Sequence, residues 1–355
     1  MLSHLPKPKP DFTRLRKVLL RQGEPDRLPL VELLVDREMM EAVLGERIPY
    51  ADPHDTAARQ RELDGVIRFW HRTGYDYITV QAGVPVQRWS LAADDTAALK
   101  HERRHWDNEN AGPIMSWADF ERFPWPRPEQ VDYSAIEYIN AHLPEGMQMI
   151  FLGPGGQFEN LSELMGLAPL AIAVHDDPAL VQAVADKVGE MLANLFATVA
   201  EMPNIGALWL GDDLGYKTST ILSPRHLRQY VFPTQKRLAA IAHARGLPFL
   251  LHSCGNLERI LPELIGEVGI DARHSFEDVI VPVAESKRRW GKRIAILGGV
   301  DVDFLCRSSA EEVRAYTHRV IEECAPGGGY ALGTGNTVAN YIPVKNYLAM
   351  IETRE

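Results

Sequence analysis

Short apolar segments alternate with segments of helical period along almost the whole chain of 355 residues. The period at which apolar residues recur distinguishes helices from buried strands. Strands that alternate with helices favour a parallel sheet covered by helices, and eight such units form a barrel. We therefore predict an α/β protein with a single TIM-type (β/α)8 barrel. The predicted strands cover eight segments, at 27–35, 75–80, 147–152, 205–210, 249–251, 268–275, 293–297 and 330–333.

Helices are predicted between and around these strands, at 12–22, 55–73, 134–143, 177–202, 223–245, 311–324 and 344–351. Residues 1–11 carry Pro and Lys and are predicted to be a flexible arm, so the barrel domain is assigned to 12–355. Residues 88–128 carry no clear period and are rich in Trp, Asp and Pro. Loops of this length in compact domains are usually lids or binding loops. We predict a lid-like insertion after the second strand.

The bulk composition excludes several classes of function. The net charge of −10 argues against nucleic acid and against an anionic membrane surface as partners. No apolar run approaches the roughly 18 residues of a spanning helix. The three cysteines are too few for a disulfide framework, which favours a reducing compartment. We expect a cytoplasmic protein that acts on a small molecule.

The fifth predicted strand ends in the sequence Leu-His-Ser-Cys-Gly-Asn at 251–256. A strand that leads directly into a turn at the barrel mouth presents its last side chains to a cleft. His252 and Cys254 are the nitrogen and sulfur donors that zinc prefers. The alternative is that Cys254 is a buried small hydrophobe, because free cysteines are often buried and zinc needs at least three protein ligands.

Polar residues follow the other predicted strands as well. The ends supply Gln81, Gln157, Glu159, Asp212, Asp213, His274 and Asn336, and Glu32 lies inside the first apolar strand. A carboxylate in an apolar strand is costly unless it is paired or faces a cleft. Adjacent carboxylates on a strand point to opposite sides, so one of Asp212 and Asp213 is expected to face the site and the other to cap a turn. His274 is either an acid–base or supporting residue, or a capped histidine at a strand end.

The chain resembles the uroporphyrinogen decarboxylase superfamily in several motifs that occur in order. They are Gly-Glu-Pro-Asp-Arg-Leu-Pro at 23–29, Leu-Ser-Pro-Arg at 222–225, the segment at 251–256, Leu-Gly-Gly-Val-Asp at 297–301, and Gly-Thr-Gly-Asn with Tyr-Ile-Pro-Val-Lys-Asn-Tyr at 333–347. The resemblance implies a distorted (β/α)8 barrel and suits a homodimer.

One branch of this superfamily, the uroporphyrinogen decarboxylases, needs no metal or organic cofactor. Its members bind substrate carboxylates through an arginine cluster just after the first strand, where this chain has only Arg37. They also carry a His near the last strand, where this chain has Thr334. The resemblance makes both residues candidates for substrate binding. Because the substrate has eight carboxylates, the loss of the cluster argues against porphyrinogen decarboxylation.

The other branch comprises corrinoid-dependent methyltransferases. They bind catalytic zinc through His-x-Cys after the fifth strand, which His252 and Cys254 match, and through a Cys near the last strand. That last position falls at or near Asn336, so the third ligand is missing. A carboxylate from Glu159, Asp212 or Asp213 can replace it, and we assign Glu159 to the metal.

The leading prediction is zinc-assisted methyl transfer from a methylcobalamin-type corrinoid, presented by a partner protein, to a thiol or a tetrahydrofolate-type acceptor. Glu32, Gln81, Gln157, Arg37 and Thr334 are predicted to bind substrate, and Asp212, Asp213, His274 and Asn336 to take part in catalysis. The first alternative is a decarboxylase, with Arg37, Arg88, Arg103 and Arg104 as the basic residues of its cleft. The second is a non-catalytic barrel that binds a corrinoid or tetrapyrrole.

Overall fold

The computed structural model describes residues 7–50, 55–100 and 103–354. Of the predicted arm at 1–11, residues 1–6 therefore lie outside the described residues. Residues 7–11 lead without regular structure into α1 (Phe12–Leu19). The Asp11 side chain accepts the Thr13 N–H and so caps this helix at its first residue.

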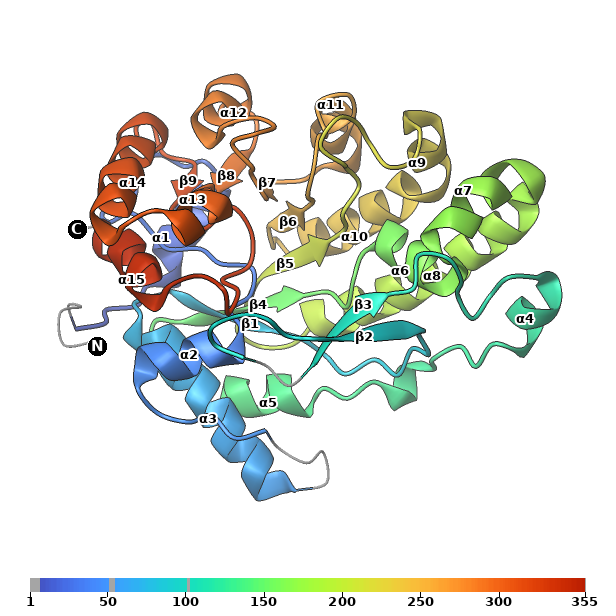
Figure 1. Cartoon of the computed structure of the whole chain (residues 1–355), viewed down its shortest axis with the longest axis horizontal. Coiled ribbons are helices and arrows are strands. Elements are labelled where there is room, and N and C mark those ends of the chain that lie inside the picture. The colour runs from blue at the N-terminus through green and yellow to red at the C-terminus, as the bar shows by residue number, and fades with distance from the viewer. Residues whose placement is uncertain (1–6, 51–54, 101–102, 355) are drawn as a thin grey trace.

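Seven parallel strands form a curved sheet in the order β1-β4-β5-β6-β7-β8-β9 (Figure 1). All of these strands were predicted from the sequence, and β9 corresponds to the predicted strand at 330–333. The strands read as continuous apolar runs because helices cover the outside and side chains fill the inside. The α/β barrel architecture is confirmed. The strands are β1 (Tyr77–Val80), β4 (Gln148–Leu152), β5 (Ile205–Gly211), β6 (Phe249–His252), β7 (Ala272–His274), β8 (Ala295–Leu297) and β9 (Tyr330–Ala331).

The predicted first strand at 27–35 is wrong as a regular strand. It makes only two isolated parallel bridges, Leu30 with Leu332 and Val35 with Val338. Between them the Glu32 carboxylate takes the Thr334 N–H at 2.9 Å. On its other side, the Glu32 N–H donates to the Tyr77 hydroxyl at 2.8 Å. Backbone hydrogen bonds join the segment to residues 332 and 338, and the side-chain contacts interrupt this ladder between the two bridges. The barrel is distorted at this seam.

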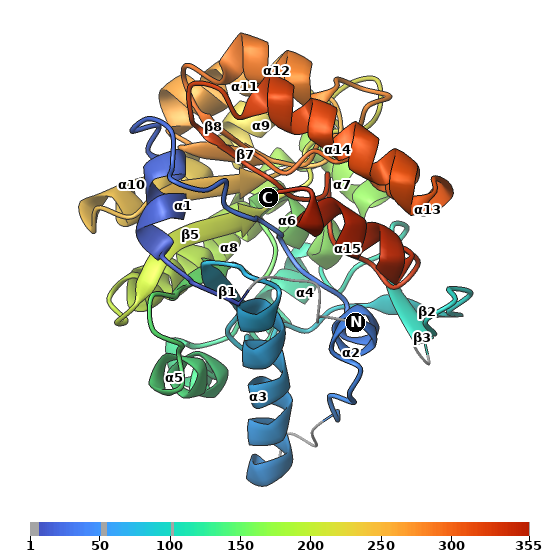
Figure 2. The same ribbon diagram turned by 90° about the vertical axis from the view of Figure 1, so that its left-hand side faces the viewer.

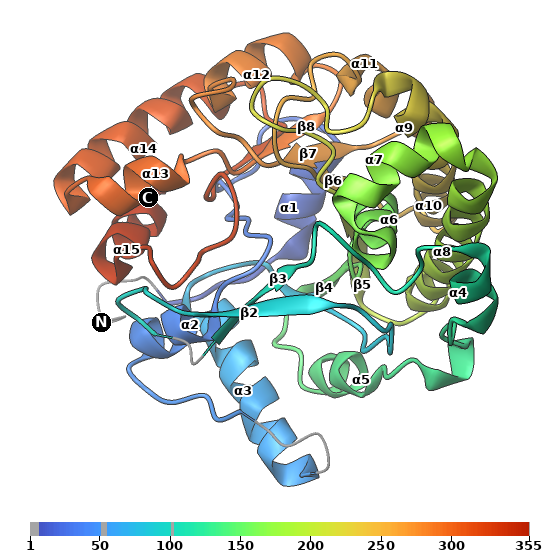
Figure 3. The ribbon, with the colours of Figure 1, turned by 45° about the vertical axis from the view of Figure 1, so that its right-hand side comes forward.

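Helices surround the sheet on its outer side (Figure 3). The predicted helices at 55–73, 134–143, 177–202, 311–324 and 344–351 are confirmed within a few residues. The one predicted at 223–245 is two helices, since Pro233 follows a break at Val231. The remaining helices are α2 (Arg37–Leu44), α3 (Thr56–Arg72), α4 (Trp117–Arg122), α5 (Ser134–Ala141), α6 (Gln157–Met165), α7 (Leu167–Asp176), α8 (Pro178–Ala200), α9 (Pro224–Tyr230), α10 (Phe232–Ala244), α11 (Leu261–Glu263), α12 (Val283–Trp290), α13 (Val302–Arg307), α14 (Ala310–Cys324) and α15 (Val344–Glu352), with a 3₁₀ turn at Pro128–Gln130 and a π turn at Leu264–Val268.

The insertion after β1 crosses the end of the barrel where the strands terminate, opposite α1 (Figures 2 and 3). It contains an antiparallel hairpin, β2 (Ser90–Asp94) and β3 (Arg103–Asp107). On one side the Arg104 guanidinium contacts the Asn340 side chain, and on the other Arg88 donates to Asn160 in α6 at 2.8 Å. The lid-like insertion is confirmed. Its hairpin was not predicted, because its strands are exposed and lack an apolar alternation.

Candidate functional site

Two histidines meet where β6 and β7 end. The parallel register pairs His252 with His274, so both rings point to the same side of the sheet. Their Nδ1 atoms are 2.7 Å apart. Both side chains are buried, with 5% and 0% exposure. Burial, followed by the Arg273 charge, lowers the pKa of His252 to about 3, and burial also lowers the pKa of His274 well below its ordinary value. Both rings are therefore neutral at neutral pH.

The hydrogen bonds fix the tautomer of each ring. The His274 Nε2 lies 3.2 Å from the Thr334 carbonyl oxygen, which can only accept, so this nitrogen carries the proton. The His274 Nδ1 is then an acceptor, and His252 must donate from its own Nδ1. This leaves an unprotonated His252 Nε2, 3.5 Å from the Cys254 Sγ. An imidazole oriented by a hydrogen bond from its other nitrogen is the usual form of a metal-ligating histidine.

The Cys254 sulfur accepts hydrogen bonds from two neighbours. The Asn336 Nδ2 lies 3.2 Å from it and the Ser275 Oγ 3.4 Å. Burial, and then the Asp213 charge, raise the pKa of the metal-free Cys254 thiol. Ser275 was missed as a site residue. Its φ of +84° is rare for a residue with a side chain, and such strain gathers at functional sites, but a sequence carries no sign of it.

Asp213 supplies the third converging group. Its Oδ1 lies 3.5 Å from His252 Nε2 and accepts the Cys254 N–H at 2.8 Å. Within the described ranges, Asp213, His252 and Cys254 form the only group of three or more potential metal ligands whose donor atoms lie within 4.8 Å of one another. Glu159, which we predicted as the ligand, is not in that group. Its carboxylate accepts the N–H of Gly156 and of Asp213, both at 3.1 Å, and so shapes the turn that holds Asp213.

Asp212 does not face the site, which corrects its predicted catalytic role. Its side chain is completely buried and accepts the N–H groups of Gln157, Phe158 and Glu159 at the start of α6. Gln235 donates to it from α10 at 2.7 Å. As expected for adjacent strand residues, one of the two aspartates faces the cluster and the other caps a structural element.

Two glutamines predicted to bind substrate are not brought to the cluster. Gln157 is buried, and its Nε2 donates to the Ala185 carbonyl in α8 at 2.8 Å, which corrects the prediction. Gln81 is exposed just after β1, and β1 is not adjacent to β6 or β7. Its role in substrate binding stays a prediction.

Glu32 and Thr334 are enclosed rather than available to a substrate, so the predicted binding role is wrong for both. Each has 0% exposure. The Thr334 Oγ1 lies 2.5 Å from a Glu32 oxygen, and its N–H donates to the other oxygen. The backbone approaches so closely here that a Cβ on Gly333 would lie 1.7 Å from the Val31 carbonyl oxygen. Glu32 and Thr334 thus form a buried pair, and the Thr334 hydroxyl contacts the main-chain carbonyl oxygen of Asn336.

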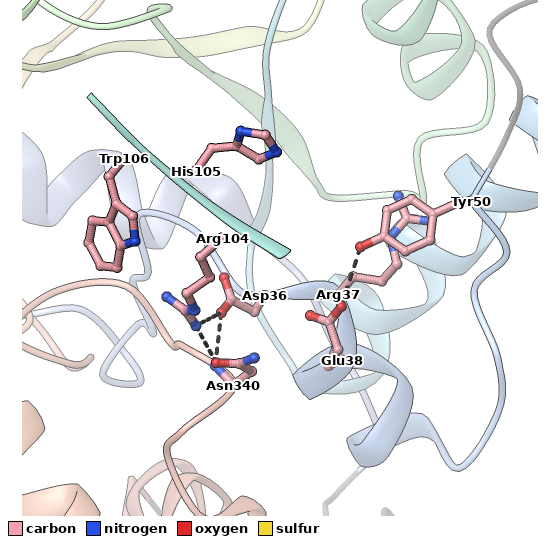
Figure 4. Close-up of a pocket in the computed structure, with 8 residues that line it drawn as sticks. All are labelled: Asp36, Arg37, Glu38, Tyr50, Arg104, His105, Trp106 and Asn340. Atoms are coloured by element: carbon pink, nitrogen blue, oxygen red, sulfur yellow. Dashed lines mark hydrogen bonds and ion pairs between the residues drawn. The ribbon is translucent and has the colours of Figure 1, made fainter. Parts of the chain in front are cut away.

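Arg37 lines a separate pocket of about 340 Å³ beside the hairpin (Figure 4). Its guanidinium pairs with Glu62 and lies 3.7 Å from the centre of the Tyr50 ring. Arg104, in the same pocket, lies 3.6 Å from an Asp36 oxygen and 3.3 Å from an Asp95 oxygen. The pocket is lined by Asp36, Arg37, Glu38, Tyr50, Arg104, His105, Trp106 and Asn340.

The cluster fits a zinc ion in its chemistry. It offers one imidazole nitrogen without a proton, one sulfur and one carboxylate, and each of the three is a donor type that binds zinc in proteins. The hydrogen bonds from Asn336 and Ser275 to the sulfur favour a thiolate over a thiol. Three protein ligands leave a position open, as in catalytic rather than structural zinc sites.

No helix in the described part of the chain combines the length and the hydropathy needed to cross a membrane. Among solved structures, the fold is similar to a methyltransferase from Methanosarcina mazei, with a TM-score of 0.71, 16% identity, and coverage of 96% of this chain and 97% of that one. It is also similar to a putative vitamin-B12-independent methionine synthase from Listeria monocytogenes, with a TM-score of 0.52, 11% identity, and coverage of 93% and 97%. At these identities the likeness concerns the fold alone.

By sequence, the chain is 25% identical over 210 residues to a uroporphyrinogen decarboxylase from Thioalkalivibrio sulfidiphilus. That match covers 57% of this chain and only about half, 54%, of the relative. The profile of the uroporphyrinogen decarboxylase (URO-D) family matches residues 109–355, which is more than half of the chain and includes every residue of the His–Cys–Asp cluster. The chain therefore belongs to the uroporphyrinogen decarboxylase family.

Proposed function

We propose that this protein is a zinc-assisted methyltransferase that moves a methyl group from a corrinoid, carried by a partner protein, to a thiol or a tetrahydrofolate-type acceptor. The observation that carries the proposal is the convergence of Asp213, His252 and Cys254. The likeness of the whole fold to a methyltransferase supports it. A zinc ion held by these three residues would supply a Lewis acid that lowers the pKa of a thiol bound beside it.

The residues of the chain then have separate tasks. His252 presents the lone pair of Nε2, because its Nδ1 proton is committed to His274. Asn336 and Ser275 stabilise negative charge on the Cys254 sulfur. The Asp213 side chain is 40% exposed, so it is the member of the cluster that meets the barrel mouth and an incoming substrate.

With a thiol as the acceptor, the acceptor sulfur would form a bond to the methyl carbon. The methyl-corrinoid would serve as the donor substrate and keep the electron pair of its bond to the methyl group, while the thiol proton would pass to solvent. The insertion that spans the barrel mouth between Asn340 and Asn160 limits the access of water to this step.

The ion pairs of the basic residues weigh against the decarboxylase alternative. Arg37 is paired with Glu62, Arg88 with Glu163 at 2.8 Å, and Arg104 with Asp95. Guanidinium groups already neutralised by carboxylates bind further substrate carboxylates poorly. The Arg103 side chain lies outside the described residues. We therefore retain decarboxylation, and likewise the non-catalytic binder, only as outcomes of the test below.

The test is the demethylation of methylcobalamin, followed by absorbance, with zinc-loaded protein and a small thiol or tetrahydrofolate. We expect turnover by the natural chain, and none by His252→Ala. His318→Ala is the matched control, because this histidine is 66% exposed and lies 3.3 Å from Glu322 on its own helix. Full turnover by His252→Ala would contradict the proposal. Stoichiometric binding of the corrinoid without turnover would support the non-catalytic reading instead, and decarboxylation of a porphyrinogen without metal would support the decarboxylase.

A further inference from the structure

Thr334 connects the buried Glu32 to two parts of the cluster. It contacts His274 through its carbonyl, and it contacts Asn336, which binds the Cys254 sulfur, through its hydroxyl. Its carbonyl accepts the His274 Nε2–H at 3.2 Å, and also the Gly299 N–H at 3.1 Å. Its N–H donates to Glu32 Oε1 at 2.9 Å. Its hydroxyl lies 2.5 Å from Glu32 Oε2 and also contacts the Asn336 carbonyl oxygen. The orientation of His252 and that of the Asn336 amide on Cys254 thus both depend on this threonine.

The contacts of the Thr334 hydroxyl require one more proton than the hydroxyl itself has. A hydroxyl carries a single proton and can donate only one strong hydrogen bond. The Asn336 carbonyl can only accept, so it must receive that proton. Glu32 Oε2 can then make a favourable contact only if it donates a proton of its own to Oγ1. If Glu32 were ionised, either its Oε2 or the Asn336 carbonyl oxygen would face Thr334 Oγ1 with no proton between the two oxygens.

The surroundings of Glu32 favour the same state. Its carboxyl group is enclosed, and burial raises its pKa to about 8 although the Thr334 N–H, which donates to Oε1, acts in the opposite direction. Among the described residues, the titratable groups that interact with its charge are all tyrosines. They are Tyr75 just before β1, Tyr77 on β1, Tyr330 on β9 and Tyr347 on α15. None of these supplies a positive charge that would hold a carboxylate in its ionised form.

We propose that Glu32 is a positioning residue that stays protonated at neutral pH. It donates to the Thr334 hydroxyl, which in turn donates to the main-chain carbonyl of Asn336. In this way it holds the groups that contact His274 and the Cys254 sulfur in place. The chain of donors runs from Glu32 Oε2–H to Thr334 Oγ1, and from Thr334 Oγ1–H to Asn336 O. Asn336 then directs its Nδ2–H at the Cys254 sulfur. The consequence for metal binding rests on the proposed function, whereas the protonation of Glu32 does not.

The protonation can be tested on the metal-free protein by infrared difference spectroscopy at pH 7. A protonated carboxyl group has a C=O stretch separate from that of a carboxylate, and it shifts in heavy water. Because Asp212, Glu159 and Glu163 also have raised pKa values, the natural chain must be compared with Glu32→Gln. We expect that Glu32→Gln removes one protonated-carboxyl band. Loss of a carboxylate band instead would overturn the proposal.

The positioning role can be tested by the affinity of the cluster for Co²⁺, read from its thiolate charge-transfer absorption. Gln at position 32 keeps a donor where the acid has Oε2–H, so Glu32→Gln should retain the affinity. Glu32→Leu has no donor and should weaken it about tenfold, the lower end of the range for residues that support metal ligands. Thr334→Ser keeps the hydroxyl and should retain the affinity, whereas Thr334→Val should lose it as Glu32→Leu does.

These results separate the two proposals. Equal Co²⁺ affinity in Glu32→Leu and Glu32→Gln, with both variants folded, would overturn the positioning role. Failure of Co²⁺ to bind the natural chain would contradict the proposed methyl transfer and would leave the infrared result to decide the protonation of Glu32. If Glu32→Leu and Thr334→Val fail to fold, the infrared comparison with Glu32→Gln still decides that protonation.

Discussion

His252 and His274 share a hydrogen bond between their Nδ1 atoms, 2.7 Å apart, and the Thr334 carbonyl sets its direction. The proton on His274 Nε2 is fixed by that carbonyl, so the shared proton belongs to His252. His274 therefore acts on the cluster through His252, and it does not contact the barrel mouth, since its exposure is 0%. Of the roles predicted for His274, these contacts favour that of a supporting residue, and its acid–base role stays a prediction.

Substitution of His274 should weaken metal binding without removing a ligand. In His274→Ala, the His252 Nδ1–H loses its acceptor and the ring is free to rotate or to change tautomer. We expect the zinc affinity, measured by competition with a chromophoric chelator, to fall about 10- to 100-fold. His318→Ala should leave it unchanged. Equal zinc affinity of His274→Ala and the natural chain would contradict the tautomer assignment.

The identity of the carboxylate ligand can be tested by a pair of variants. Asp213→Asn replaces a charged oxygen in the cluster and should lower zinc affinity at least tenfold. Burial, and then the charges of Asp212 and Asp213, raise the pKa of Glu159 well above its ordinary value, so Glu159→Gln resembles its neutral form. We expect Glu159→Gln to bind zinc nearly as well as the natural chain. The reverse order of affinities would restore Glu159 as the ligand.

Asp212 should matter for stability rather than for metal content. Asp212→Ala leaves three N–H groups of α6 and the Gln235 amide without their acceptor. We expect the free energy of unfolding in urea to fall by about 3 kcal/mol. Asp177→Ala removes a single cap bond to Leu180 N at the start of α8 and should cost about 1 kcal/mol. Loss of zinc from a folded Asp212→Ala would contradict this assignment.

Glu32 should make the stability of the fold depend on pH. Burial raises its pKa from 4.5 to about 8, so the folded state holds the proton more tightly than the unfolded state. The contribution is fully present below pH 4.5 and is lost as the pH rises towards 8, at up to about 1.4 kcal/mol per pH unit. Glu32→Gln should flatten this part of the profile and be relatively more stable at pH 9. Parallel pH profiles of the two proteins in urea unfolding would contradict it.

The sequence was sufficient for the α/β barrel class and for the two donors at the end of β6, because both follow from local patterns. Apolar runs mark the strands, and His252 and Cys254 belong to one short motif at a strand end. The choice between Asp212 and Asp213 required the direction of each side chain, which depends on where β5 ends. Glu159 was misassigned because its position at a strand end does not reveal that two backbone N–H groups bind its carboxylate.

Long-range contacts account for the other errors. Glu32 reads as a polar residue facing a cleft, but its partner Thr334 is 302 positions away and encloses it. The same contact interrupts the backbone ladder of the predicted first strand between its two bridges. Ser275 and Asn336 meet at the Cys254 sulfur only after three strand ends are assembled, so their shared role could not be derived from their separate segments.

The most direct test of the account is the metal content of the protein purified without added zinc or chelator. We predict about one zinc per chain for the natural protein and none for Cys254→Ala. Cys306→Ala should keep its zinc, because Cys306 is on α13 and outside the cluster. A natural chain that takes up no zinc even after incubation with it, or a Cys254→Ala variant that retains it, would contradict the central claim.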